Sequence, residues 1–170
     1  MGKTTWGRYW AEKWQVPFYD TDEEIEKRSG ICISQWFSQQ GEPAFRAAER
    51  TIMYSLLVHE PPLIVATGGG LPTQEGMVDA LSRAGYVVWI DLPWEKLRLR
   101  WRAAVSTRPL LQAYDDAQWR VLLEKRRFFY RQADLHWNPE RIPSPIVERW
   151  VKRCLFFGCT FFRRGSALIV

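Results

Sequence analysis

Short apolar runs alternate with longer segments of helical periodicity along most of the chain. The runs at 16–20, 63–67 and 86–92 read VPFYD, LIVAT and YVVWIDL, and their β-branched and aromatic residues are typical of strands. Because strand-like and helix-like segments alternate, the pattern predicts an α/β domain built on a parallel sheet that is flanked by helices.

Apolar residues repeat at helical spacing in two of the early segments. Trp6, Trp10 and Trp14 recur every four residues and predict a first helix that Pro17 closes. A longer helix is expected to begin near Pro43, and its apolar side carries Phe45, Ala48, Ile52 and Leu56. We interpret most of the ten tryptophans as core and surface packing, because they share this spacing with aliphatic residues.

Two further helices are expected at about 94–103 and 116–132. The stretch AVSTRPLLQAYDD between them is polar and contains a proline, which predicts a lid over about 103–118. Near the C-terminus, SPIVERWVKRC is helix-like, and the segment LFFGCTFFRRGSALIV follows it.

Composition narrows the class of protein. A chain of 170 residues with 46% hydrophobic and 25% charged residues fits one soluble globular domain. Its formal net charge of +5 suggests an anionic partner. The basic residues are spread along the whole chain rather than gathered in a stripe with aromatic residues, so nucleic-acid binding is not expected.

Cysteine and histidine indicate neither a disulfide framework nor a metal cluster. Cys32, Cys154 and Cys159 are odd in number and lack CxxC spacing, and His59 and His136 are isolated. The longest apolar run, CLFFGCTFF, is much shorter than a membrane span of roughly 20 residues. We therefore expect a cytoplasmic protein without a membrane partner.

Two motifs carry candidate phosphate and metal chemistry. GKTT matches the end of the phosphate-binding pattern GxxxxGK[ST], so Gly2, Lys3 and Thr4 could meet a phosphate at a helix start, although a solvated helix start is an equal alternative. In FYDTD, Asp20 and Asp22 follow a strand and are expected to project to one side, where they could hold Mg²⁺ and orient a hydroxyl. The alternative for Asp22 is a helix cap.

Three further segments carry candidate ligands for an anion. Glu42, Arg46 and Glu49 share a helix face, and a surface salt-bridge ladder is a simpler interpretation than an arginine held ready for a carboxylate. The three glycines of ATGGGLP would let backbone N–H groups approach a ligand closely. Arg108 in the lid, and Arg126 and Arg127 in EKRRFFY, could each stabilise negative charge or be ordinary surface residues.

The order of GKTT, FYDTD, GEPAFR, ATGGG, RPLL and EKRxxxY resembles that of the shikimate kinases, from Gly2 to about Asp134. The resemblance implies a P-loop kinase fold, a three-layer sandwich with a parallel sheet between helices. It also implies transfer of the γ-phosphoryl group of ATP to the 3-hydroxyl of shikimate with Mg²⁺, in aromatic amino-acid biosynthesis, by a monomer. Another small-metabolite kinase such as gluconate kinase, or a catalytically silent relative that binds without transfer, are the alternatives.

The resemblance also implies a role for each matching residue. Lys3 would contact the β- and γ-phosphates beside Gly2 and Thr5, Thr4 would bind Mg²⁺ with Asp20, and Asp22 would accept a hydrogen bond from the reacting hydroxyl. Arg46 and Arg126 would bind the shikimate carboxylate, and Gly69 and Gly70 would donate backbone N–H groups to the same ligand. Arg108 would close with the lid, and either Arg100 or Arg102 would lie at the adenine, with Arg102 included among the ATP-binding residues. Phe128 stands where the family usually has proline.

The family begins with a buried strand and a glycine-rich loop ahead of GK, and this sequence lacks about a dozen such residues. We therefore expect a kinase domain over 1–153 without its first central strand, from a truncated or miscalled start, with weak or no activity. The remainder, 154–170, has no counterpart in the resemblance. A disordered sticky tail is the leading expectation for it, a sequence artefact is a second, and ALIV at 167–170 filling the vacant strand position is a third.

Overall fold

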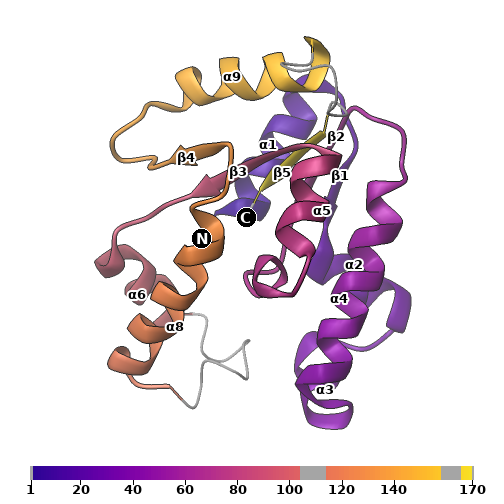
Figure 1. Ribbon diagram of the computed structural model, residues 1–170, viewed down its shortest axis with the longest axis vertical. Coiled ribbons are helices and arrows are strands. Elements are labelled where there is room, and N and C mark those ends of the chain that lie inside the picture. The colour runs from indigo at the N-terminus through magenta and orange to yellow at the C-terminus, as the bar shows by residue number, and fades with distance from the viewer. Residues whose placement is uncertain (1, 104–113, 158–165, 170) are drawn as a thin grey trace.

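The computed structural model describes residues 2–103, 114–157 and 166–169 (Figure 1). Its helices are α1 (Lys3–Trp14), α2 (Thr21–Ser29), α3 (Ile33–Gln39), α4 (Gly41–Leu57), α5 (Met77–Ala84), α6 (Trp94–Ala103), α8 (Asp116–Tyr130) and α9 (Ser144–Phe157), with a 3-10 turn η1 (Leu71–Thr73). Its strands are β1 (Phe18–Asp20), β2 (Leu63–Ala66), β3 (Tyr86–Ile90), β4 (Leu135–Trp137) and β5 (Ser166–Ile169).

The strands form one parallel sheet in the order β1-β2-β5-β3-β4. The predicted α/β architecture with a parallel sheet between helices is therefore confirmed. In Figure 1, α9 crosses one end of the molecule, α6 and α8 lie on one side, and α2, α3 and α4 lie on the other. Because all strands are parallel, their carboxyl ends meet at one edge of the sheet, where open α/β sheets bind ligands.

Most predicted elements occur close to their expected positions. The tryptophan repeat forms α1, the helix expected near Pro43 begins at Gly41, and the helix expected at 116–132 ends at Tyr130. The described residues also form four short elements that were not predicted, namely α3, η1, α5 and β4, whereas α2 is the helix that the alternative of a cap at Asp22 implied. The middle of the expected lid, 104–113, lies outside the described residues.

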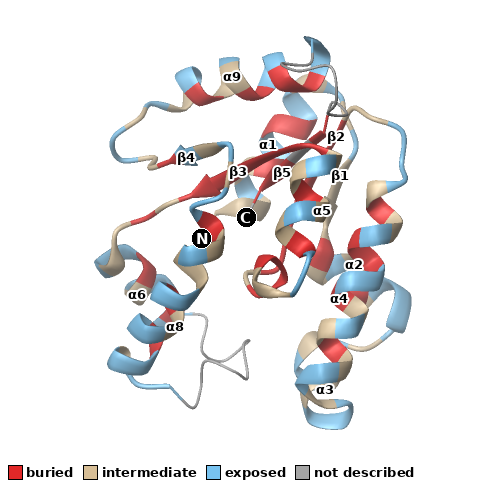
Figure 2. Ribbon diagram, in the orientation of Figure 1, coloured by how far each residue is buried: buried red, intermediate tan, exposed pale blue. Residues whose placement is uncertain are grey.

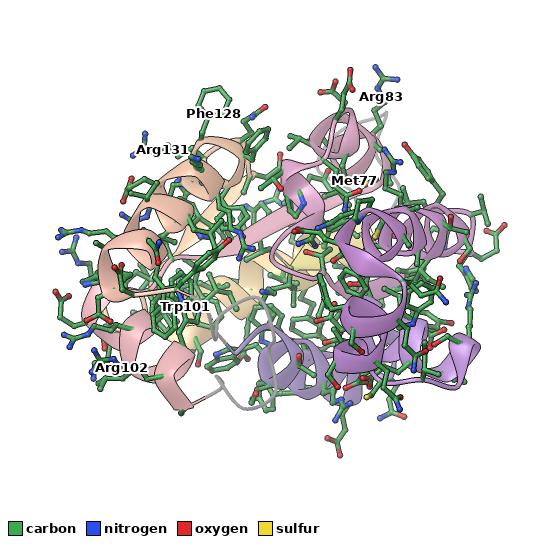
Figure 3. All side chains as sticks on the ribbon, turned by 90° about the horizontal axis from the view of Figure 1, so that it is seen from below. Met77, Arg83, Trp101, Arg102, Phe128 and Arg131 are labelled. Atoms are coloured by element: carbon green, nitrogen blue, oxygen red, sulfur yellow. The ribbon has the colours of Figure 1, made fainter. Side chains whose placement is uncertain are left out.

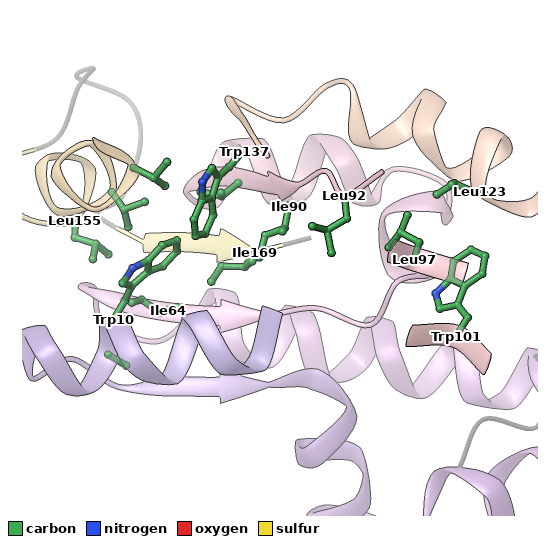
Figure 4. Close-up of a cluster of buried hydrophobic side chains, with 14 of the residues drawn as sticks. Trp10, Ile64, Ile90, Leu92, Leu97, Trp101, Leu123, Trp137, Leu155 and Ile169 are labelled. Atoms are coloured by element: carbon green, nitrogen blue, oxygen red, sulfur yellow. The ribbon is translucent and has the colours of Figure 1, made fainter. Parts of the chain in front are cut away.

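Each face of the sheet has its own apolar core. Ile64 and Ile169 pack with α1 and α9, whereas Val65 and Leu168 pack with α4 and α5. Neighbouring residues of a strand separate in this way because successive side chains point to opposite faces. The tryptophans Trp10, Trp101, Trp119 and Trp137 are buried, which confirms their interpretation as core residues (Figures 2 and 4).

The leading expectation for the C-terminal segment is wrong. Residues up to Phe157 extend α9, and Ser166–Ile169 form β5 at the centre of the sheet rather than a disordered tail. The third alternative, in which this segment fills the vacant strand position, is the one that the structure bears out. Leu168 and Ile169 are fully buried there, whereas 158–165 lie outside the described residues.

Candidate active site

A polar pocket of about 250 Å³ opens at the carboxyl edge of the sheet. Its lining comes from the start of α1, the end of β1 with the start of α2, and the turn after β2, through Gly2, Lys3, Thr4, Thr5, Asp20, Asp22, Thr67, Gly68 and Gly69. The structure thus brings together three of the motifs that the sequence separates by up to 67 positions. Each motif stands at the end of a strand or at the start of a helix, so the arrangement of these elements at the sheet edge brings the motifs together.

Helix α1 begins at the pocket because Gly2 turns the chain into it. Gly2 has a φ of 92°, a left-handed conformation that suits glycine, and its carbonyl accepts the first helical bond from the Trp6 N–H at 2.9 Å. The first N–H groups of a helix have no partner within the helix, and together with its dipole they favour an anion. Lys3 and Thr4 stand in that first turn.

Asp20 joins α1 to α2. One oxygen of its carboxylate accepts a bond from the Thr4 hydroxyl at 2.6 Å, and the other accepts the Asp22 N–H at 3.0 Å. Asp20 is therefore the N-cap of α2, and the alternative that placed the cap at Asp22 is wrong. Asp22 lies in the first turn of α2 instead, which leaves its carboxylate to line the pocket.

The glycine turn after β2 is held from three elements. The buried hydroxyl of Thr21 accepts the Gly68 N–H at 2.8 Å, Tyr130 of α8 donates to the Gly69 carbonyl at 2.5 Å, and Thr73 donates to the Gly70 carbonyl at 2.7 Å. A Cβ at Gly68 would lie only 2.8 Å from an Asp22 oxygen. Glycine is thus required here by close packing, and the turn keeps a fixed shape beside Asp22.

Arg46 of α4 sits between two acids at the inner side of this turn. Its guanidinium donates to Glu42 Oε1 at 2.9 Å and to Glu49 Oε2 at 2.6 Å. Gln74 also donates to Glu49 Oε2 at 3.0 Å, and Glu49 is only 1% exposed. Both ion pairs of the expected salt-bridge ladder are therefore present, but only the pair with Glu42 lies at the surface, because Glu49 is in the core and fixes the arginine.

Burial dominates the electrostatics of this cluster. It raises the pKa of Glu49, and attraction to Arg46 offsets only part of that effect. Burial also raises the pKa of Tyr130, against a lowering influence of Arg126. For Arg46, burial alone would lower the pKa, but Glu49 and Glu42 raise it overall, so its positive charge is secure.

The neighbouring arginines Arg126 and Arg127 of α8 have different surroundings. Arg126 lies close enough to Glu49 and Tyr130 for its charge to lower the pKa of both. Arg127 instead pairs with Glu124 at 2.8 Å and with Asp91 at 3.4 Å. Arg126 thus lies near Glu49 and Tyr130 whereas Arg127 is paired elsewhere, and the choice of Arg126 over Arg127 as the carboxylate ligand stays a prediction.

Arg100 and Arg102 of α6, the two candidates for the adenine side, also have different surroundings. Arg102 binds Asp116 at the start of α8 at 2.9 Å and lies at the outer edge of the molecule (Figure 3). The Arg100 guanidinium approaches Gly2, where a Cβ would lie 3.6 Å from its Nη1. The structure therefore places Arg100, rather than Arg102, at the start of α1. Arg108 lies outside the described residues.

The oxygen donors of the pocket fit a magnesium ion that is shared with a phosphate ligand. The Thr4 hydroxyl and an Asp20 oxygen are 2.6 Å apart, and both are hard donors. Mg²⁺ usually takes one or two carboxylates together with waters and phosphate oxygens. The described residues contain no group of three or more His, Cys, Asp or Glu side chains that could hold a metal alone, so such an ion would need the phosphate.

Gly70→Ala is expected to lower the free energy of unfolding by about 1–3 kcal/mol. The added Cβ would lie 2.6 Å from Arg46 Cζ, and Glu42 and Glu49 hold that guanidinium in place. Urea denaturation measures the loss. In an Arg46→Ala background the same substitution should cost much less, and an equal cost in both backgrounds would refute the steric explanation.

Sequence reasoning missed three residues that shape the site. Thr21 and Gln74 act through buried hydrogen bonds, and Thr67 connects the glycine turn to β5. Signals were available for two of them, since Thr21 lies between two pocket aspartates and Thr67 directly precedes the glycine run. Gln74 has no distinguishing pattern, because its partner Glu49 is distant in sequence.

Comparisons with known proteins agree in one family. A family model for shikimate kinase matches residues 1–155. The shikimate kinase of Aquifex aeolicus (strain VF5) is 35% identical over 147 residues, which cover 86% of this chain and 86% of the relative. That of Parasynechococcus marenigrum (strain WH8102) is 42% identical over 135 residues, with 79% and 70% covered.

Solved structures extend the likeness to three dimensions. The shikimate kinase from Acinetobacter baumannii in complex with shikimate has a TM-score of 0.79 at 33% identity, covering 89% of this chain and 85% of that one. The structure of the Aquifex aeolicus protein has a TM-score of 0.72 at 33% identity, covering 89% and 87%. None of the helices in the described ranges is both long and apolar enough to span a membrane.

Proposed function

The chain belongs to the shikimate kinase family, and we propose that it transfers the γ-phosphoryl group of ATP to the 3-hydroxyl of shikimate. The observation that carries this proposal is the convergence of Asp22, the glycine turn and the partly exposed Arg46, held by the buried Glu49, near the start of α1. An arginine guanidinium and backbone N–H groups can bind the carboxylate of an acidic polyol, and a carboxylate can bind one of its hydroxyls. The N-terminus of a helix can bind the phosphates of the phosphoryl donor.

On the nucleotide side, Lys3 meets the β- and γ-phosphates with the first-turn N–H groups of α1, next to Gly2 and Thr5. Thr4 and Asp20 hold Mg²⁺, which would neutralise charge on the phosphates when bound. Arg100 takes the adenine side in place of Arg102, because Arg102 is engaged by Asp116. Arg108 closes from the lid.

On the acceptor side, Arg46 and Arg126 bind the shikimate carboxylate. Glu49 orients Arg46 through a 2.6 Å bond, so the planar fork is set before the ligand arrives. Gly69 and Gly70 offer N–H groups, and Asp22 accepts the hydrogen bond of the reacting hydroxyl. Little covalent help is needed, because phosphoryl transfer depends mainly on positioning and charge stabilisation.

A coupled ADP-release assay with ATP and Mg²⁺ tests the proposal. We expect turnover with shikimate and not with gluconate or without an acceptor. Turnover with gluconate alone would refute the substrate assignment. Binding of shikimate in calorimetry without any ADP release would instead support a silent relative.

We also propose that the protein is a cytoplasmic monomer and that its ligands are ATP and shikimate. Cys32 and Cys154 are free thiols, which suits a reducing compartment. Light scattering coupled to size exclusion tests the monomer.

Tyr130→Phe is expected to raise the shikimate KM about 2- to 10-fold while kcat changes little, because one hydrogen bond contributes about 0.5–1.5 kcal/mol. The lost hydroxyl is the one that holds the Gly69 carbonyl. Steady-state kinetics measure the effect, and Tyr54→Phe on the exposed side of α4 is the matched control. Equal KM values for both variants would contradict the positioning role.

A further inference from the structure

Strand β5 occupies the middle of the sheet although it comes last in the chain. It pairs in parallel with β2 on one side and with β3 on the other. Ile169 stands opposite Ala66, which in turn stands opposite Asp20. The carboxyl end of β5 is therefore level with the strand end that carries the pocket aspartate.

Both cores depend on this strand. Leu168 packs into the core of α4 and α5, and Ile169 packs into the core of α1 and α9. Figure 4 shows Ile169 among Trp10, Ile64, Ile90 and Trp137. β5 thus contributes apolar side chains to the cores on both faces of the sheet.

The end of β5 also contacts both halves of the pocket. The Ile169 carbonyl accepts the Thr67 N–H at 3.0 Å, and Thr67 directly precedes the glycine turn. On the other side α1 lies over the strand, so closely that a Cβ at Gly7 would lie 3.3 Å from Ile169 Cδ1. Displacing β5 would therefore disturb the glycine turn and the helix that starts at Lys3 together.

A phosphate-binding motif consists of a strand, a glycine-containing loop that ends in GK[ST], and a helix. Here the helix begins within GKTT at Lys3, while the strand beside it comes from residues 166–169, beyond the 1–155 matched by the family model. We propose that β5 and α1 form one phosphate-binding unit split between distant parts of the chain, so that nucleotide binding and docking of β5 stabilise each other. The inference rests on the proposed function, because it takes the nucleotide site at Lys3 and Thr4 as given.

Reciprocal coupling is the consequence that can be measured. If nucleotide binds the docked form better, docking must strengthen nucleotide binding by the same factor, and such factors are about 5- to 150-fold. Shikimate should be coupled to β5 more weakly, because α2, α4 and α8 supply most of its proposed contacts.

Hydrogen exchange of the intact chain, followed by mass spectrometry with and without MgADP, tests the coupling directly. We expect exchange at 166–169 to slow at least fivefold with saturating MgADP. Unchanged exchange at 166–169, while the amides of the first turn of α1 become protected, would overturn the proposal. A chain that binds shikimate but no MgADP would refute the nucleotide part of the proposed function itself.

Two leucine truncations separate the coupling from general loss of stability. Leu168→Ala in β5 and Leu81→Ala in α5 both remove a buried leucine of the same core, but Leu81 belongs to a helix and not to the strand proposed to couple to α1. We expect Leu168→Ala to raise the MgADP Kd at least fivefold and Leu81→Ala to leave it within twofold, in calorimetry below the unfolding temperature of both variants. Equal MgADP affinities in the two variants would overturn the proposal.

Discussion

Asp22→Asn is expected to lower kcat about 10²- to 10⁴-fold while shikimate still binds. The carboxylate of Asp22 lines the pocket beside Gly68, where we propose that it accepts the hydrogen bond of the attacking hydroxyl. A neutral amide of the same size accepts that bond more weakly and cannot take up the proton. The fold should persist, because Asp20 and not Asp22 caps α2. Steady-state ADP release gives kcat, and calorimetry with shikimate gives the affinity.

Asp79→Asn is the matched control for this substitution. Asp79 is exposed in the first turn of α5 and lines a different surface groove. Its kcat should equal that of the unmodified chain. A kcat within threefold of the unmodified value for Asp22→Asn would contradict the proposed role of Asp22 at the reacting hydroxyl.

The local sequence pattern was sufficient to predict elements whose apolar residues recur at helical spacing or form an unbroken run. The four-residue repeat of tryptophan predicts α1, and the apolar run at 86–92 predicts β3, because periodicity reports directly which side chains are buried. β5 shows where this fails. An apolar run such as ALIV suits a core strand and a sticky tail equally well, and its pairing with Leu63–Ala66 and Tyr86–Val88 is set by contacts far away in sequence.

The site residues were predicted to the extent that motifs mark them. GKTT, DTD and the glycine run lie around one pocket, as strand ends in a parallel sheet must. The spacing of Glu42, Arg46 and Glu49 could not reveal that Glu49 is buried, because i, i+4 and i+7 are the same on a solvated face. Nor could it separate Arg100 from Arg102, since that depends on Asp116 of another helix.

Arg46→Met is expected to lower the free energy of unfolding by about 3–5 kcal/mol near neutral pH, because it leaves Glu49 buried without its cation. It should also weaken shikimate binding about 10- to 100-fold, since charged hydrogen bonds contribute about 1.5–3 kcal/mol. Urea denaturation measures the first effect and calorimetry measures the second.

The stability loss of Arg46→Met should depend on pH, and the pKa of Glu49 determines the direction of that dependence. Burial raises the pKa of Glu49 and Arg46 lowers it, so removing Arg46 raises it further. A folded-state pKa above the unfolded value of about 4.3 means that the folded protein holds the proton more tightly. The variant should therefore be more stable at about pH 5 than at about pH 8, because stability falls as pH rises through the raised pKa.

Adding Glu49→Gln to Arg46→Met separates the contribution of Arg46 to stability from its contribution to shikimate binding. The neutral amide can remain buried beside Gln74 without a cation, so the double variant should recover most of the lost stability and lose the extra pH dependence. Shikimate affinity should stay as weak as in Arg46→Met, because Arg126 alone is left to bind the carboxylate. Recovery of affinity in the double variant would show that Arg46 acts only by neutralising Glu49, and an unchanged stability loss would show that the buried charge is not its cause.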